Sequence, residues 1–294
     1  MSVKGLKAFV TGGSGAVGRN LVPYLAAAGM EMRVLKHDKP LPDCGAEVVV
    51  GDIRNFQDGW LDGIDVVFHL AAETVPSRKK NSMYEVNAGG TAGVVRALRR
   101  LASPPRLVFT SSVAVFGPCL DGTPMTDDSP PNPITGYGRS KVEAEAAVLE
   151  YPRSVIVRFP MVVGPGDRVT ARFAGLAGLG IFPVTPKRFC AIDARDAVRL
   201  LLHLADGGAG QGCTYTVSDG EIYSWKDVAR HFGALQGRKV FTFKVPDVFL
   251  TPGLFRLAGN EDAACYLKHD WTCRPSFPPG FAIQHKVFDK GRPQ

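Results

Sequence analysis

The residues best suited to chemistry are Tyr137 and Lys141, which lie four positions apart at the start of a helical pattern over 137–150. That spacing places both side chains on one face of a helix. A tyrosine with a pKa of about 10 is a poor base at neutral pH, but a nearby ammonium stabilises the phenolate and lowers that pKa. The pair can then give a proton to a carbonyl or take one from an alcohol.

Two further features stand at predicted strand ends. Ser112 follows a strand expected at 106–111, where its hydroxyl can hydrogen-bond a reacting oxygen and steady developing charge. The stretch Thr11-Gly-Gly-Ser-Gly-Ala-Val-Gly18 has glycines at 12, 15 and 18. Glycine allows a tight turn close to a pyrophosphate, and the following helix N-terminus offers free N–H groups. This loop predicts dinucleotide binding.

The elements that would position these residues alternate between strands and helices, which is typical of βαβ units and a parallel sheet. Strands are expected at 7–11, 31–35, 47–50, 65–70, 106–111, 154–158 and 214–217. Helices are expected at 17–28, 83–101, 137–150, 193–204 and 224–235. The predicted fold class is α/β, a Rossmann-type doubly wound parallel sheet with a smaller C-terminal substrate-binding part.

The domain boundaries follow from a change of character after Gly164-Pro-Gly166, beyond which glycine and proline are frequent. Residues 1–163 are expected to form the Rossmann domain, with 190–217 returning to it. Residues 164–189 and 218–294 are expected to bind substrate. The proline-containing last 30 residues fit either loops that cover a site or a frayed end.

Composition narrows the class of protein. The chain has 294 residues, 45% of them hydrophobic, which is enough to fill a sizeable core. The net charge is +7, with basic clusters at 78–80, 99–100 and 187–188. Because no aromatic residues interleave with these clusters, the surplus favours phosphate-bearing cofactors over nucleic acid as partners.

Location and metal content follow from what the sequence lacks. There is no apolar run of roughly 20 residues and no signal-peptide pattern, so a cytoplasmic protein with no membrane partner is expected. The six cysteines form no C-x-x-C pair, and no two of the six histidines have i, i+4 spacing. We therefore expect free thiols and no metal site.

Taken in order, these motifs resemble the extended short-chain dehydrogenases/reductases, the NAD-dependent epimerase/dehydratase family, over residues 7 to about 245. Tyr137-Gly-Arg-Ser-Lys141 is similar to that family's Tyr-x-x-x-Lys pair, and Ser112 lies at the position of its catalytic serine. The resemblance implies that Lys141 also holds the nicotinamide ribose. It implies that Asn87 supports the proton relay, which completes the expected catalytic set.

The same resemblance assigns cofactor contacts. Gly51-Asp-Ile53 looks like the stretch whose acid contacts adenine, and His69-Leu-Ala-Ala72 looks like the strand end beside the cofactor. His69 itself is expected to be a buried, hydrogen-bonded strand residue, and Asp196 to cap or support its helix. The implied cofactor-binding residues are Gly12, Gly15, Ala16, Val17, Gly18, Lys36, His37, Asp52, Ile53, Leu70, Ala71, Ala72, Tyr137, Lys141, Pro160 and Val162.

The choice between NAD and NADP depends on the end of the second strand, where an acid binds the ribose of NAD and a basic residue suits the phosphate of NADP. By resemblance Lys36 occupies the place of the usual acid. Asp38 lies about 20 residues beyond the glycine loop, where an acid is also expected. Lys36, His37 and Lys39 form a cationic rim, so NADP is slightly favoured and NAD stays open.

The substrate class depends on the segment after the sixth strand. Relatives that act on nucleotide sugars usually carry Arg-x-x-Asn-x-Tyr-Gly-Pro, but Met161 and Val163 stand at the asparagine and tyrosine places. Neither side chain can donate a hydrogen bond. The remaining candidate lining is apolar, so the chain looks nearer to the 3β-hydroxysteroid dehydrogenase and dihydroflavonol reductase branch. The expected substrate contacts are Glu73, Phe116, Met161 and Phe173.

Three functions stay open at this point. The first is an NAD(P)-dependent oxidoreductase interconverting a secondary alcohol and a ketone or aldehyde on a small apolar molecule. The second is a nucleotide-sugar epimerase or dehydratase, and the third is a non-catalytic NAD(P)-binding protein. Apolar stripes in 83–101 and 137–150 also predict a homodimer, since such helices often meet their copies in this family.

Overall fold

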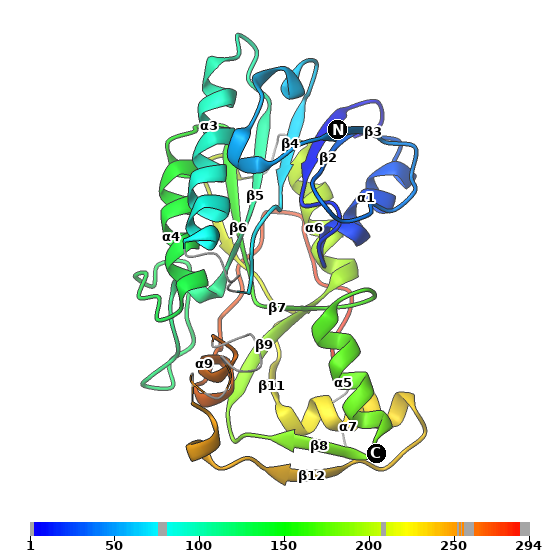
Figure 1. The fold of residues 1–294 in the computed structure, drawn as a ribbon, viewed down its shortest axis with the longest axis vertical. Helices are drawn as coiled ribbons and strands as arrows, with labels where there is room; N and C mark the ends of the chain where they lie inside the picture. Colours follow the sequence, from blue (N-terminus) through cyan, green and yellow to red (C-terminus); the bar gives the residue numbers. More distant parts are fainter. Residues whose placement is uncertain are drawn as a thin grey trace.

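The computed structural model describes residues 3–75, 81–206, 210–251, 253, 255 and 262–288. The predicted basic cluster at 78–80 lies outside the described residues. In Figure 1 a large sheet with its flanking helices occupies the upper part of the molecule, and smaller sheets and helices occupy the lower part.

The upper part is a seven-stranded parallel sheet. Its strands are β1 (Lys7–Thr11), β2 (Glu31–Lys36), β3 (Glu47–Val50), β4 (Val66–His69), β5 (Arg106–Ser112), β6 (Ser154–Phe159) and β10 (Thr214–Thr216). The order across the sheet is β10-β6-β5-β4-β1-β2-β3, and all neighbours are parallel. The order reverses between β1 and β4, where sheets of this kind bind ligands at the carboxyl ends of the strands.

Helices cover both faces of this sheet. On one face lie α1 (Gly18–Ala27) and α6 (Ala194–Ala205), and on the other lie α3 (Gly90–Arg100) and α4 (Gly136–Leu149), as Figure 1 shows. Their apolar residues close a core on each face, for example Leu25 on one and Leu98 on the other. The predicted α/β, doubly wound fold class is confirmed. The apolar stripes of 83–101 and 137–150, on which the dimer prediction was based, pack against the chain's own sheet.

Helix termini follow local signals that the sequence displays. Gly29 has a φ of 77° and ends α1 as expected, because glycine adopts this left-handed conformation without a side-chain clash. Helix α7 (Trp225–Leu235) starts with a capping box in which Ser224 and Asp227 satisfy each other's backbone N–H groups. That helix and its N-cap are where the sequence predicts them.

The stretch 83–101, predicted as one helix, is divided. It consists of α2 (Ser82–Tyr84), a π-helical turn η3 (Glu85–Gly89), and α3. A π turn inserts one residue into the helical repeat and often marks a functional position. The predicted helix is confirmed over residues 83–100, but the π turn within it was not predicted, because an apolar pattern of period 3.6 does not record a single inserted residue.

The lower part contains two small sheets. The strands β7 (Met161–Val163), β9 (Arg188–Asp193) and β11 (Ile222–Ser224) form one, and β8 (Ile181–Val184) pairs with β12 (Phe241–Lys244) in the other. Helices α5 (Arg168–Gly178), α7 and α9 (Asp262–Lys268) accompany them. Short 3₁₀ turns are η1 (Ile53–Asn55), η2 (Asp58–Leu61), η4 (Val113–Val115) and η5 (Asp247–Phe249).

An aromatic core joins these lower elements. Phe189 stacks near Trp225 at 4.8 Å between ring centroids, and Tyr223 meets Phe288 edge to face at 5.0 Å. Residues 194–216 return to the large sheet, since α6 packs on it and β10 pairs with β6, whereas β9 belongs to the lower part.

The C-terminal segment 269–288 is held against both parts. Asp196, fully buried on α6, accepts backbone hydrogen bonds from Gln284 at 3.1 Å and His285 at 2.7 Å. The Asp219 carboxylate accepts one from Val287 at 2.9 Å. Of the two readings left open for the last 30 residues, packed loops rather than a frayed end describe the segment up to 288.

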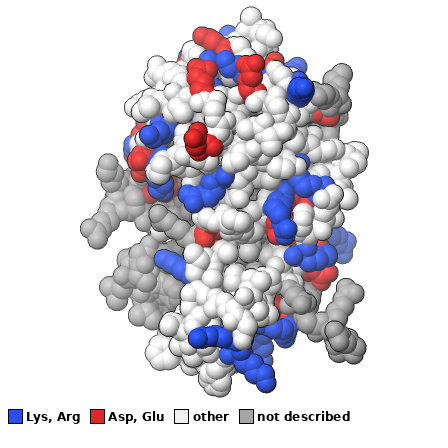
Figure 2. All heavy atoms as spheres, turned by 90° about the vertical axis from the view of Figure 1, so that its right-hand side faces the viewer, with Lys and Arg blue, Asp and Glu red and all other residues white. Residues whose placement is uncertain are grey.

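The described residues lack two kinds of feature, namely membrane-spanning helices and groups of metal-ligating side chains. None of their helices is long and apolar enough to span a membrane, and no cluster of three or more metal-ligating side chains occurs among them. Figure 2 shows basic side chains scattered over one face of the molecule, including its lower end.

Candidate active site

The glycine loop after β1 approaches its neighbours so closely that side chains are excluded. Gly12 has a φ of 73°, and a Cβ there would lie 2.6 Å from the backbone N of Ala71. A Cβ on Gly18 would lie 2.2 Å from the carbonyl oxygen of Gly12. Gly15 and Ala16 at the tip are exposed, so the backbone N–H groups that begin α1 face outward for a ligand.

A buried histidine fastens this loop to the neighbouring strand end. His69 is 0% exposed, and its ring contacts Thr11 Oγ1 through Nδ1 at 2.7 Å and Thr91 Oγ1 through Nε2 at 2.8 Å. Because Thr91 donates its own hydroxyl proton to the Asn87 carbonyl, it accepts from Nε2–H. Thr11 then donates to Nδ1. Burial lowers the pKa of His69 to about 3, so the ring is neutral.

Asn87 connects that cluster to the helix that carries Tyr137. Its side-chain oxygen accepts from the backbone N of Glu73 at 2.8 Å, while Nδ2 donates to the Glu73 carbonyl and to Ser140 Oγ, each at 2.9 Å. Ser140 Oγ donates to the Tyr137 carbonyl at 2.8 Å. The π-helical turn that presents Asn87 thus fixes both the segment after β4 and the first turn of α4.

Ser112, Tyr137 and Lys141 come together at the carboxyl end of β5. The hydroxyl of Ser112 accepts from the backbone N of Ala114 at 3.2 Å and lies near enough to the Tyr137 side chain to act on its pKa. Lys141 is 2% exposed, and its Nζ donates to the Thr110 carbonyl at 2.8 Å. The three side chains that the sequence selects are therefore neighbours at one strand end.

The electrostatics of the pair differ from the sequence-based expectation. Burial raises the pKa of Tyr137 to about 12, and the hydrogen bond from Ser112 acts in the opposite direction. Burial lowers the pKa of Lys141 to about 8, although nearby Glu145 opposes that change. The expected lowering of the tyrosine pKa by the ammonium was wrong in sign for this structure, because desolvation of the phenol dominates while Lys141 donates to a carbonyl.

A buried ion pair orients α4 against the sheet. Arg158, at the end of β6, donates to both carboxylate oxygens of Glu145 at 2.9 and 2.7 Å. Its guanidinium also lies 4.7 Å from the ring centre of Phe116. Glu145 stands one turn after Lys141, so this bidentate contact restricts how the Tyr137–Lys141 face can rotate.

Comparison with known proteins identifies this arrangement. The sequence profile of the NAD dependent epimerase/dehydratase family matches residues 8–211, more than half of the chain.

The chain belongs to this family.

Its relatives include reductases and dehydrogenases of the predicted branch. It is 32% identical over 217 residues to a 4-hydroxy-2-methyl-3-oxo-4-farnesyl-3,4-dihydroquinoline-1-oxide ketoreductase of Stigmatella aurantiaca, covering 68% of this chain and 62% of that one. A ceramide reductase of Caulobacter vibrioides is 28% identical, with coverages of 93% and 81%. A 3-beta-hydroxysteroid dehydrogenase of Mycolicibacterium neoaurum is 29% identical, with coverages of 81% and 72%.

The fold agrees with solved structures of this type. The Bordetella bronchiseptica enzyme WbmG, solved in complex with NAD and UDP, superposes with a TM-score of 0.78 at 21% identity. The match covers 97% of this chain and 92% of that one. The chain spans less than two thirds of the length of the ketoreductase, so that protein's activity carries over only as a proposal.

The residues present fit the nicotinamide cofactor that the family implies. The cradle at Gly12 and Gly18 admits no side chain, and Leu70 and Ala71 form its opposite wall. Segment 70–72 lies at the carboxyl end of β4, Pro160 lies between β6 and β7, and Val162 lies on β7. When bound, NAD(P)H supplies a hydride; the protein supplies position and electrostatics.

Beside Asp52, the residue predicted to contact adenine, lies one charged residue that sequence reasoning missed. Arg54 donates through Nε to both oxygens of Asp52 at 3.0 Å, which helps to lower the pKa of Asp52 to about 2. His37 Nε2 lies 3.6 Å from Asp52, and its Nδ1 lies 3.4 Å from Asp38. Arg54 directly follows the Asp52-Ile53 stretch that the family resemblance singled out. Its positive charge could therefore have been added to the predicted cationic rim of Lys36, His37 and Lys39.

Not all predicted substrate contacts lie at this site. Phe173 packs among Phe182, Trp225 and Phe232 at centroid distances of 5.8 to 6.1 Å, and Phe116 is 5% exposed within the same core. Packing in the core explains why Phe116 and Phe173 are apolar, so these two rings give no support to an apolar substrate pocket.

Two other predicted substrate contacts keep partly accessible side chains. Met161 is half-buried on β7, the strand that follows Pro160. Glu73 is half-buried next to Asn87 and accepts a hydrogen bond from Ser82 at 2.7 Å. Both residues therefore stay as candidates.

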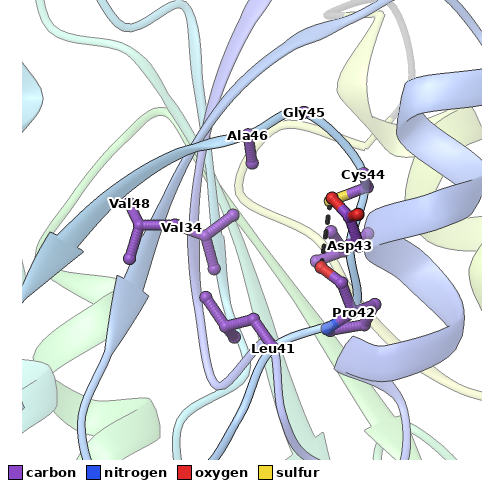
Figure 3. A pocket seen from close by; sticks show the side chains of 9 residues that line it. Val34, Leu41, Pro42, Asp43, Cys44, Gly45, Ala46 and Val48 are labelled. Carbon is purple, nitrogen blue, oxygen red and sulfur yellow. Dashed lines mark hydrogen bonds between the residues drawn. The ribbon is translucent and has the colours of Figure 1, made fainter.

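A hollow in the upper part is separate from this chemistry. Figure 3 shows a cavity of about 110 Å³ lined by residues of β2, β3 and the connection between them, including Val34, Leu41 and Cys44. Residues 37–46 join these strands without a helix, which leaves the gap. Because Ser112 and Tyr137 are not among its lining residues, the candidate active site is identified by its side chains instead.

Proposed function

We propose that this chain is an NAD(P)-dependent oxidoreductase that interconverts a secondary alcohol and a ketone on an apolar substrate. The observation that carries the proposal is that Ser112 and Tyr137 lie side by side, with buried Lys141 one helical turn after Tyr137. Relatives named for ketone, ceramide and steroid substrates support the substrate class.

In this proposal each residue has one task. Ser112 donates a hydrogen bond from its hydroxyl to the substrate oxygen and keeps its proton, while its own oxygen accepts from Ala114. Tyr137 gives its phenolic proton to the ketone oxygen as that oxygen gains charge, and solvent returns the proton. The raised pKa of Tyr137 keeps the phenol protonated at neutral pH, as reduction requires. Asn87 positions the first turn of α4 through Ser140.

We propose further that Lys141 holds the nicotinamide ribose. Its pKa of about 8 keeps the ammonium mostly charged at neutral pH, and its present partner is a backbone carbonyl that a ribose hydroxyl can replace or share. Met161 and Glu73 are proposed as the substrate contacts. Residues 164–189 and 218–288 are proposed to form the part that shapes the substrate site.

We propose a preference for NADP over NAD. Lys36 ends β2, His37 follows it, and Arg54 adds a third cationic side chain beside Asp52. A 2′-phosphate is attracted to such a rim more strongly than a hydroxyl is. Asp38 and Asp52 reduce this attraction, so the proposed preference is modest.

Assembly and location complete the proposal. A homodimer through the outer faces of α3 and α4 is supported by the small residues Ala146 and Ala147 of α4, exposed and half-buried, which allow close helix approach. Sedimentation at micromolar concentration tests it, and a monomer alone would contradict it. Free thiols suit a reducing compartment, which supports a cytoplasmic location.

The substrate class is tested by a panel of apolar ketones, apolar secondary alcohols and nucleotide sugars. Cofactor absorbance is followed together with product analysis, because an epimerase regenerates its cofactor within each cycle. We expect turnover of apolar compounds with net cofactor conversion. Epimerisation or dehydration of a UDP- or GDP-sugar would instead support the alternative function that the sequence left open.

A further inference from the structure

The outer face of the small β8–β12 sheet is apolar. The parallel register pairs Ile181 with Phe241 and Pro183 with Phe243, so these four residues share one face. On β8 the alternate residues Phe182 and Val184 are buried against the lower core. A sheet with one buried face normally shows polar residues on the other, but here the outer face carries apolar residues as well.

These side chains remain accessible among the described residues. Phe241 is 69% exposed, and Ile181 and Phe243 are 45% and 43% exposed. Leu179 before β8, and Val248 and Phe249 in η5 after β12, are also exposed. Contiguous apolar surface of this kind marks a place where a protein meets another apolar surface. We call Leu179, Ile181, Phe241, Phe243, Val248 and Phe249 the apolar strip.

The segments that carry the apolar strip are rich in basic residues. Residues 179–188 and 236–251 together contain five Lys or Arg residues and one acidic residue. Lys239 and Lys244 are exposed, and Arg238 donates to the carbonyl of Gly178 at 2.7 Å beside the start of β8. Figure 1 shows β8 and β12 at the lower end of the molecule, and Figure 2 shows basic side chains at that end.

We propose that this end of the molecule docks on an anionic lipid surface. Exposed aromatic and aliphatic side chains insert into the acyl boundary, and flanking lysines interact with anionic headgroups. A second copy of this chain fits less well, because a two-fold interface sets each patch against its own copy and places Lys239 and Lys244 near like charges. The lack of a membrane-spanning helix concerns insertion across a bilayer, not binding to its surface.

The test uses the purified full chain and flotation with lipid vesicles. One set contains phosphatidylcholine and phosphatidylglycerol in equal amounts, and the other contains phosphatidylcholine alone. We expect binding to the anionic vesicles, weaker binding to neutral ones, and loss of binding as added salt screens the lysines. The double variant Phe241→Ser/Phe243→Ser should bind the anionic vesicles at least about tenfold more weakly than the wild type, because it removes two inserting rings.

Matched variants separate the surface from folding. Leu120→Ser changes another exposed apolar residue, 76% exposed in the loop that follows η4, and should leave vesicle binding unchanged. Lys239→Glu/Lys244→Glu should abolish the preference for anionic vesicles without removing any apolar side chain. Melting temperature and cofactor binding confirm that each variant is folded.

The outcomes that overturn the proposal are specific. Wild-type protein that does not float with anionic vesicles excludes it, as does a double phenylalanine variant that floats equally well. Self-association that the phenylalanine variant abolishes, without vesicle binding by the wild type, would assign the strip to a second copy. Because flotation requires no turnover, either failure leaves the proposed alcohol–ketone chemistry untouched.

Discussion

The glycine loop and the C-terminal segment are held in place in opposite ways. The turn between β1 and α1 is enforced by contacts within Gly12–Gly18 and with the adjacent segment 70–71. The segment at 284–287 depends on Asp196 and Asp219, which lie 68 to 89 positions earlier in the chain. The contacts within Gly12–Gly18 join residues close in sequence and leave a readable motif, whereas the distant buried acids leave isolated aspartates that resemble any others.

The difference also separates chemistry from shape. The upper part brings Ser112, Tyr137 and Lys141 to one strand end through regular strands and helices. The lower part has short strands around an aromatic core, and its distinctive surface is the apolar strip. We therefore expect substitutions in the upper part to alter rate and cofactor affinity, and those in the lower part to alter stability and contacts with other molecules.

The largest effect is expected from Tyr137→Phe. This change removes the proposed proton donor but keeps the ring, so turnover should fall by about 10²-fold or more, the scale of general acid–base catalysis. Cofactor affinity, measured by fluorescence titration, should stay close to that of the wild type. Full turnover by this variant would contradict the assignment of Tyr137 as the proton donor, and with it the placement of the reaction in the upper part.

Asp196→Ala tests the long-range anchor. The aspartate is fully buried and accepts from two backbone N–H groups and Arg199, so its loss should lower the free energy of unfolding by about 3 kcal/mol. Asp58→Ala, which removes an exposed pair with Arg100, should change it by about 1 kcal/mol at most. Denaturant titration compares them, and equal effects would contradict the distinction between the regions.

Gly18→Ala tests the short-range constraint. A methyl group 2.2 Å from the Gly12 carbonyl must displace the loop, and the lost phosphate contacts should weaken NAD(P)H binding about tenfold or more. Gly175→Ala is the control in the lower part, since its Cβ meets nothing within 4 Å. Calorimetric titration gives both affinities. Unchanged binding by the Gly18 variant would mean that the loop does not hold the cofactor.

The smallest effect concerns cofactor choice. Lys36→Asp replaces attraction for a 2′-phosphate with repulsion at a half-buried site open to solvent, so the affinity ratio of NADPH to NADH should fall about fivefold. The preference of the wild type should weaken with salt. Equal affinities for both cofactors in the unmodified protein would show that Lys36 and His37 do not discriminate between them.

Features of the fold that depend on local signals could be predicted from the sequence, and features that depend on other signals could not. The seven strands of the large sheet and the helices α1, α4, α6 and α7 were predictable, because apolar periodicity, Gly29 and the Ser224 cap are local signals. The π-helical turn at Asn87 was not, since one inserted residue barely changes the pattern. Strands β8 and β12 were missed because they are short, and on β12 the apolar residues face outward.

Site residues divide similarly. Ser112, Tyr137 and Lys141 were found through spacing and motif order, and they do lie together. The sign of the tyrosine pKa shift could not be inferred, because it depends on burial and on Lys141 donating to Thr110. Phe116 and Phe173 were chosen by apolar character alone, which does not separate a core residue from a pocket residue.

The central claim, net oxidoreduction at the Ser112–Tyr137–Lys141 site, is tested most directly with a reduced cofactor that carries deuterium at the transferable C4 position. An apolar ketone substrate from the panel is incubated with the wild type, and the alcohol is analysed by mass spectrometry. The account predicts one deuterium in each alcohol molecule and one oxidised cofactor formed per product. A product without deuterium, formed without net cofactor oxidation, would contradict it.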